Sequence, residues 1–120
     1  MTTWPDLDAL TAADLDHLLP VFAALAETCT ERGHARMAQA AYAVATERYR
    51  RDNPELAALP LPPLDELPTT TLAALVSALD RPGGSPGLAA WREDTQRAAF
   101  AAVSRRVTAR RQRAERRGRW

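Results

Sequence analysis

The long stretch without a helix breaker near the C-terminus constrains the fold more than any other part of the sequence. Between Leu88 and Arg117 there is neither proline nor glycine, and Ser85-Pro86 ahead of it has the form of an N-cap followed by the first helical residue. Its apolar positions are Leu88, Trp91, Ala98, Phe100, Ala102, Val103 and Val107. We expect one helix of about thirty residues, roughly 45 Å long. The other predicted helices are too short to cover it, so its end from Ser104 onward is expected to project into solvent or onto a partner.

A first helix is predicted after a capping box at Thr11-Ala-Ala-Asp14, which Leu10 and Leu15 flank at the positions of a hydrophobic staple. Its apolar residues alternate steps of three and four and form one stripe: Leu15, Leu18, Phe22, Leu25 and Cys29. The stripe keeps its phase across Pro20. We therefore expect one helix with a kink at Pro20, and two shorter helices are the alternative.

The second helix is predicted from about Ala35 to Arg51, after Gly33 has ended the first helix in the left-handed conformation. Two rows form a broad apolar face, one of Met37, Ala41 and Val44 and the other of Ala38, Tyr42, Ala45 and Tyr49. Glu47–Arg51 and Arg48–Asp52 are expected as ion pairs on its rim. The short turn between the two helices predicts an antiparallel hairpin over residues 11–52.

A proline-rich strap is predicted over residues 53–68, where five prolines follow Asn53. Leu61, Leu64 and Leu67 recur at the three-residue period of polyproline II. A brace across the helical hairpin is favoured over a ligand for an aromatic groove. Thr69-Thr70-Thr71 then caps a short helix over residues 70–80, with Leu72, Leu75, Val76 and Leu79 on its apolar side, and residues 81–87 form a loop.

These segments predict an all-α protein with a four-helix arrangement: a hairpin, a strap, a short helix and a long overhanging helix. We expect a helical domain over residues 1–103 and a basic helical extension over residues 104–120.

The distribution of charge is strongly asymmetric, although the net charge is only +1. Residues 1–80 carry five basic and twelve acidic residues, a net charge of −7, whereas residues 81–120 carry eleven basic and three acidic residues, a net charge of +8. All sixteen basic residues are arginine. The absence of lysine predicts a GC-rich, bacterial coding sequence, and this bias weakens arguments from arginine chemistry alone.

The candidate binding residues are the C-terminal arginines, which wrap around much of the predicted helix and are opposed there only by Glu115. They are Arg105, Arg106, Arg110, Arg111, Arg113, Arg116, Arg117 and Arg119. This arrangement suits contacts with the phosphates of a nucleic acid, without reading of the base sequence. The leading hypothesis is a small non-enzymatic accessory or regulatory protein that binds nucleic acid electrostatically.

Two other interpretations of the arginine cluster stay open. Docking of the same helix on an acidic protein surface is the second interpretation. It would make the chain an adaptor or a structural subunit of a larger assembly, or a homo-oligomer if the partner is a second copy. A solvated C-terminus with no specific partner is the third interpretation. In the nucleic-acid hypothesis, Trp120 adds an indole that could stack on a base.

Membrane binding is not expected, because a basic helix on a lipid surface needs large apolar residues opposite its charges. Beyond Val107 only Ala109, Ala114 and Trp120 are apolar, and the longest apolar run, Leu18 to Ala26, is too short to span a bilayer. A single cysteine and the lack of a basic signal-peptide start predict a cytoplasmic protein.

No catalytic, metal or cofactor site is predicted. His17, Cys29 and His34 match no zinc spacing, and Cys29 falls on the apolar stripe while His34 is expected to face water. The pairs Asp14–His17 and Glu27–Glu31 are typical of solvated helix faces. Gly83-Gly84-Ser85-Pro86-Gly87 lacks the Lys-Ser or Lys-Thr of a phosphate-binding loop.

Overall fold

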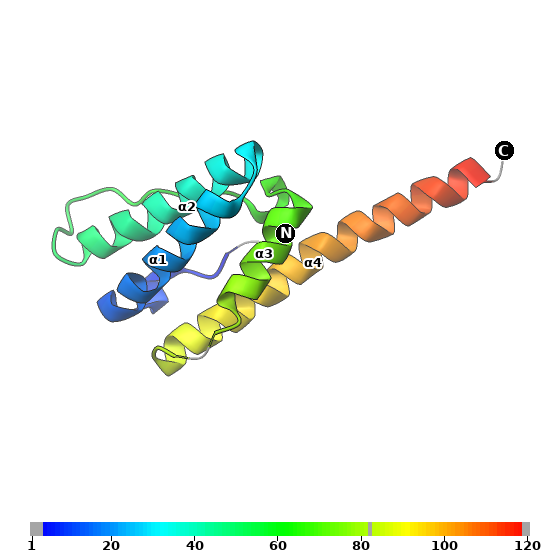
Figure 1. The fold of residues 1–120 in the computed structure, drawn as a ribbon. Coiled ribbons are helices and arrows are strands. Elements are labelled where there is room, and N and C mark those ends of the chain that lie inside the picture. The colour runs from blue at the N-terminus through cyan, green and yellow to red at the C-terminus, as the bar shows by residue number, and fades with distance from the viewer. Residues whose placement is uncertain (1–3, 82, 119–120) are drawn as a thin grey trace.

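Four helices follow the order that the sequence predicts, in a computed structural model that describes residues 4–81 and 83–118. They are α1 (Ala12–Thr28), α2 (Glu31–Arg50), α3 (Thr69–Leu79) and α4 (Pro86–Gly118), with short 3-10 turns η1 (Leu7–Ala9) and η2 (Leu64–Glu66). Helices α1 and α2 form an antiparallel hairpin, and α3 packs along α4 (Figure 1). The all-α, four-helix prediction is therefore confirmed.

The capping box at the start of α1 is present as predicted. The Asp14 backbone N–H donates to Thr11 Oγ1 at 3.1 Å, and the Thr11 backbone N–H donates to Asp14 Oδ2 at 3.1 Å. Leu10 and Leu15 on either side of it are both buried. The stripe through Leu18, Phe22 and Leu25 is buried too, and α1 continues through Pro20 as one helix, while the kink there stays a prediction.

The turn between α1 and α2 differs from the prediction. Helix α1 ends at Thr28, and α2 begins at Glu31, so Gly33 lies in the first turn of α2 and does not end α1. Gly33 is buried, and a Cβ atom built on it would lie 2.2 Å from Thr71 Oγ1. The glycine therefore permits a close approach of α2 to α3, which no local pattern reveals.

The apolar face of α2 is narrower than predicted. Met37, Ala40 and Val44 are buried, but Tyr42 and Tyr49 are 69% and 64% exposed. Ala38 and Ala45 of the second predicted row are half-buried, so the rest of the fold covers this row only in part. The ion pairs Arg48–Asp52 (3.2 Å) and Arg51–Glu47 (3.7 Å) are present, although the Glu47 side chain is buried rather than on the rim.

The proline-rich strap packs along α2, as Figure 1 shows for the green loop that leaves this helix. Gln39 Nε2 donates to the Pro60 carbonyl at 3.4 Å, and Arg50 Nε donates to the Leu56 carbonyl at 2.8 Å. Leu64 and Leu67 are buried and Leu61 is half-buried. The polyproline period is interrupted by η2, which turns the chain toward α4.

An aromatic cluster that the sequence analysis missed ties the N-terminal segment to α1 and α4. The ring centroid of Trp4 lies 5.8 Å from that of Phe22 and 6.2 Å from that of Trp91. The indole of Trp4 donates to the Pro62 carbonyl at 2.6 Å, and that of Trp91 donates to the Pro5 carbonyl at 3.2 Å. Both polar groups of these large side chains are thus satisfied inside the packed region.

Helix α3 begins one residue earlier than predicted, after Pro68, and its threonines form no side-chain cap; Thr71 is buried instead.

The predicted cap of α4 is confirmed, because the Leu88 backbone N–H donates to Ser85 Oγ at 3.2 Å. Leu88, Trp91 and Ala102 are buried as expected, whereas Phe100 and Val107 are 60% and 43% exposed. They lie on the side of α4 that the fold leaves open.

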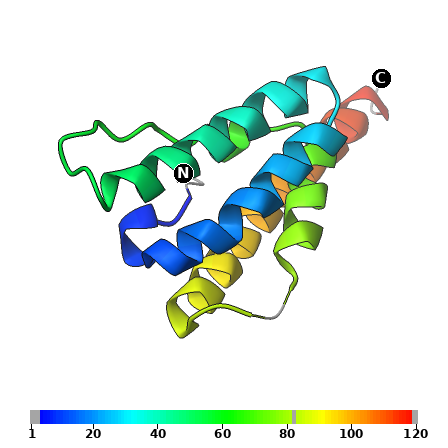
Figure 2. The same cartoon turned by 60° about the vertical axis from the view of Figure 1, so that its left-hand side comes forward.

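Helix α4 is too long for the rest of the molecule to cover. It has 33 residues, and the molecule measures 61 × 28 × 25 Å along its principal axes. Figures 1 and 2 show the C-terminal part of α4 leaving the other helices behind. From Val107 to Gly118 every described residue is exposed except Ala109, which is half-buried.

Candidate functional site

The first two predicted site residues belong to the packed part of the fold. Arg105 Nη2 lies 2.7 Å from Asp65 Oδ1, and Arg106 donates to Thr69 Oγ1 at 3.0 Å and to the Asp65 carbonyl at 2.8 Å. The overhang therefore begins after Arg106 and not at Ser104. The reason is tertiary, because η2 and the start of α3 offer oxygen acceptors beside this part of α4.

The next five predicted arginines lie on the overhang and are exposed. They are Arg110, Arg111, Arg113, Arg116 and Arg117. In the part of the chain that the structure describes, none of the five forms an ion pair, and Glu115 forms none with them. The one hydrogen bond from their side chains joins Arg113 Nε to the Ala109 carbonyl at 3.4 Å. Arg119 lies outside the described residues.

The five arginines form a row with two flanks rather than an even ring. At about 100° per residue, Arg110, Arg113 and Arg117 fall within roughly 60° of one another on the helix. Arg111 and Arg116 lie on either side of this row. The row continues the face that buries Thr95 and Ala102 further back along α4, so it points to the same side of the helix as the folded body.

Arginines of the body are mostly engaged with carboxylates, in contrast to those of the overhang. The ion pairs are Arg36–Glu66 (3.0 Å), Arg48–Asp16 (3.0 Å), Arg50–Glu47 (2.8 Å) and Arg97–Glu93 (3.1 Å). Buried Arg92 donates to the backbone carbonyls of Arg81 and Gly83. The positive charge that is free to meet a partner is therefore concentrated at the end of α4.

A hollow of about 550 Å³ lies where α4 leaves the body, and Arg32, Arg36 and Arg106 line it together with Asp65 and Glu66. Arg36 and Arg106 are engaged by neighbouring oxygen atoms, but exposed Arg32 has no ion pair within the described ranges. Arg32 is not among the predicted site residues, because it belongs to the acidic half of the chain and comes close to α4 only through the tertiary fold.

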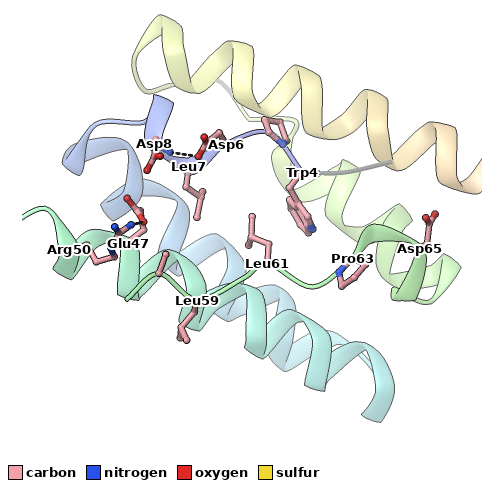
Figure 3. Close-up of a pocket in the computed structure, with 12 residues that line it drawn as sticks. Trp4, Asp6, Leu7, Asp8, Glu47, Arg50, Leu59, Leu61, Pro63 and Asp65 are labelled. Atoms are coloured by element: carbon pink, nitrogen blue, oxygen red, sulfur yellow. Dashed lines mark hydrogen bonds and ion pairs between the residues drawn. The ribbon is translucent and has the colours of Figure 1, made fainter. Parts of the chain in front are cut away.

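A second hollow, of about 520 Å³, lies between the N-terminal segment, α2 and the strap (Figure 3). Leu7 and Leu61 point into it, and Trp4 stands at one end. The Asp6 carboxylate accepts the Asp8 backbone N–H at 2.9 Å, and Glu47 is paired with Arg50. Both acidic groups thus have structural partners in this hollow.

The other residues singled out in the sequence do not converge. Asp14 turns to Thr11 and Ser85 rather than to His17, and Glu27 and Glu31 lie on different helices because α1 ends between them. Exposed His34 does more than face water, since its Nδ1 lies 2.7 Å from the Ala26 carbonyl and satisfies a free acceptor at the end of α1. Cys29 is half-buried at the C-cap of α1.

No group of three or more metal-type ligands gathers among the residues that the structure describes. The pKa of Asp14 departs from its ordinary value. Burial alone would raise the pKa of Asp14, but hydrogen bonds from Ser85 and Thr11 to its charged form outweigh burial and lower it. The lowered pKa of Asp14 therefore results from hydrogen bonds with the residues that cap α1 and α4.

Over the described ranges, none of the helices has the length and apolar character needed to cross a bilayer. Comparisons with protein-family models, with curated proteins and with solved structures found no match to this chain. Its function is therefore inferred from its own residues and their geometry.

Proposed function

We propose that this protein is a small non-enzymatic accessory or regulatory protein that binds nucleic acid through phosphates at the end of α4. One observation carries the proposal. Five exposed arginines stand on a helix that leaves the body, with no carboxylate partner in the described chain, while most arginines of the body are paired.

The row Arg110, Arg113 and Arg117 can follow a sugar-phosphate backbone along about two turns of helix. Each guanidinium offers a fork of N–H donors that matches the oxygens of a phosphate. These contacts would be independent of base sequence. If all five arginines engage duplex DNA, the logarithm of the binding constant falls against the logarithm of salt with a slope of about −4 to −5.

Arg32 extends this surface toward the body. Because the row points to the body side of α4, a strand lying along it would meet the hollow that Arg32 lines. The carboxylates of Asp65 and Glu66 in the same hollow are already paired with Arg105 and Arg36. A cytoplasmic, bacterial setting, which is proposed from the single cysteine and the use of arginine in place of lysine, suits such a protein.

The test is the anisotropy of labelled duplex DNA and of labelled RNA titrated with the protein over a range of salt concentrations. The binding variant replaces Arg110, Arg113 and Arg117 by glutamine, and the matched control replaces Arg36, Arg48 and Arg97. Both variants lose three positive charges. Only the variant of Arg110, Arg113 and Arg117 is expected to lower the affinity and to reduce the magnitude of the salt slope by about 3. Equal losses of affinity in both variants would show that net charge alone explains the binding. The proposal would be overturned if the wild type did not bind nucleic acid at low salt.

Docking on an acidic protein surface is the alternative function, because the same forks fit carboxylates. Polyglutamate of matched charge distinguishes the two. If it binds as tightly as the nucleic acids and depends on the same three arginines, the adaptor function is favoured. Nucleic-acid binding is favoured if polyglutamate binds much more weakly at equal salt.

A further inference from the structure

Helix α4 carries an exposed apolar stripe that the fold does not use. Phe100 and Val107 are 60% and 43% exposed and stand two turns apart on one face, and exposed Ala114 follows after two further turns. At about 100° per residue, this stripe is turned by roughly 120° from the buried face of Thr95 and Ala102. In a helix that pairs with another helix, apolar residues fill two positions in every seven. The stripe fills one of these positions, and half-buried Val103, between Phe100 and Val107, fills the other once.

The charges at the two ends of the stripe are opposite. Glu93 and Asp94 precede it, and Arg110 and Arg111 follow its middle. Glu93 and Arg111 are eighteen residues apart, about 27 Å along one helix, so they cannot meet within a single chain. The present partner of Glu93 is Arg97 at 3.1 Å, and both side chains are about 70% exposed, so this surface pair contributes little stability and is readily exchanged.

We propose that α4 pairs in an antiparallel manner with α4 of a second copy, across a two-fold axis close to Val103 and Ser104. Phe100 of each copy then lies against Val107 of the other. Glu93 lies within one turn of the second copy's Arg111, so the opposite charges meet. A parallel pair would instead set arginine beside arginine along the whole overhang.

The length of the overhang also supports a second copy of the chain as the partner. The stripe from Glu93 to Ala114 spans about 33 Å, and an antiparallel second copy covers it from end to end, with the two folded bodies at opposite ends. An isolated helix of a dozen residues is marginal in water, so a partner along the stripe stabilises the projecting part of α4. With two large apolar side chains from each copy, the affinity is expected in the micromolar range.

The dimer goes beyond the nucleic-acid proposal and does not depend on it. Arg113 and Arg117 lie on a different face of α4 from the stripe, whereas Arg110 borders the stripe, so pairing leaves two of the three arginines of the row accessible in both copies. The dimer is therefore tested without nucleic acid, and its failure would leave the salt-dependent binding unchanged.

Sedimentation equilibrium of the full chain, up to a few hundred micromolar, tests the association. We expect a reversible monomer–dimer equilibrium whose dissociation constant rises at least tenfold in the Phe100→Ser, Val107→Ser double variant. The matched control, Tyr42→Ser with Tyr49→Ser, removes two exposed aromatic side chains from α2 and should leave the constant unchanged. A wild-type chain that stays monomeric at the highest concentration, or a control that weakens association as much, would overturn the proposal.

Cross-linking with a short bismaleimide, in a Cys29→Ser background, tests the orientation. Ser104→Cys lies near the axis and should cross-link efficiently, whereas Arg117→Cys lies far from its counterpart and should not. Equal cross-linking at both positions would show a parallel pair. Glu93→Arg should weaken the dimer. Adding Arg111→Glu should restore it, because the double exchange again sets opposite charges against each other across the interface. A double variant that does not recover would contradict the antiparallel pairing.

Discussion

The Asp14 carboxylate accepts a hydrogen bond from the Ser85 hydroxyl at 2.7 Å and joins the first turn of α1 to the residue that caps α4. The same carboxylate accepts the backbone N–H of Thr11 at 3.1 Å and, more weakly, that of Ser85 at 3.4 Å. Ser85 Oγ in turn accepts the N–H of Leu88. Asp14 and Ser85 are 71 residues apart in the sequence, and one buried carboxylate thus orders the beginnings of two distant helices.

Replacing Asp14 by alanine should lower the free energy of unfolding by about 2 kcal/mol, because both a helix cap and the link to Ser85 are lost. Ser85→Ala should cost about 1 kcal/mol. The double variant should lose less than the sum, since both substitutions break the same hydrogen bond. Urea unfolding of the four proteins measures the coupling, and strictly additive losses would show that the contact carries no energy of its own.

Acid should remove the contribution of Asp14. Burial raises its pKa, but the hydrogen bonds from Ser85 and Thr11 bring it below the ordinary value of 3.8, so the folded state holds the proton less tightly than the unfolded state. The contribution is complete above the unfolded pKa and is lost as pH falls through the lower folded pKa. Unfolding free energies of the wild type and Asp14→Asn should therefore converge below about pH 4. A constant gap down to the acid limit would contradict this.

Gly33→Ala should destabilise the protein, although alanine is the better helix former by about 1 kcal/mol. The new methyl group would lie 2.2 Å from Thr71 Oγ1, so the Thr71 side chain or the two helices must shift, at a cost of about 1–3 kcal/mol. Thr71→Ala in the same chain removes that oxygen and should recover much of the loss. Thermal unfolding of the single and double variants tests this, and a more stable Gly33→Ala protein would show that the close approach is absent.

Substitutions of Arg106 and Arg113 should distinguish an arginine that stabilises the fold from one that binds nucleic acid. Arg106→Gln removes hydrogen bonds to Thr69 and Asp65 and should lower the free energy of unfolding by about 1 kcal/mol, with little change in the salt slope of nucleic-acid binding. Arg113→Gln should leave stability within about 0.5 kcal/mol and reduce the slope by about 1. The reverse pattern would move the candidate surface from the overhang to the body.

Arg92 should hold the loop before α4. Its guanidinium is buried and donates to the carbonyls of Arg81 and Gly83, so Arg92→Met should lower the free energy of unfolding by about 1–3 kcal/mol. Amide hydrogen exchange should accelerate at Leu88 and Ala89, whose N–H groups donate to Ser85 directly after this loop. Arg97→Met on the exposed face of the same helix is the control, and equal exchange in both variants would contradict the role of Arg92.

Local patterns predicted the elements that depend on neighbours in the sequence. The capping box at Thr11 and Asp14, the cap at Ser85 and the apolar period of α3 all act within one or two helical turns, and each is where the sequence places it. The overhang was predictable too, because a helix without breakers from Leu88 to Arg117 is longer than a domain of this size can bury.

The errors occur where a residue's role depends on what packs against it. Gly33 has the form of a helix end, but the proximity of Thr71 explains it. Tyr42 and Phe100 have helical spacing like their buried neighbours, yet no other element covers them. The role of Trp4 as the centre of an aromatic cluster depends on three distant segments coming together.

By itself, the sequence determined four helices, the caps at Thr11 and Ser85 and a basic end too long to be buried, because hydrogen bonding within a helix and hydrophobic periodicity are local. Only the tertiary structure decided which arginines of that end are free. Arg105 and Arg106 meet acceptors on η2 and α3, whereas the described arginines from Arg110 to Arg117 have no other described element beside them. Whether a charged side chain is neutralised depends on oxygen atoms that the fold brings from elsewhere in the chain, and that proximity is not written in the order of residues along α4.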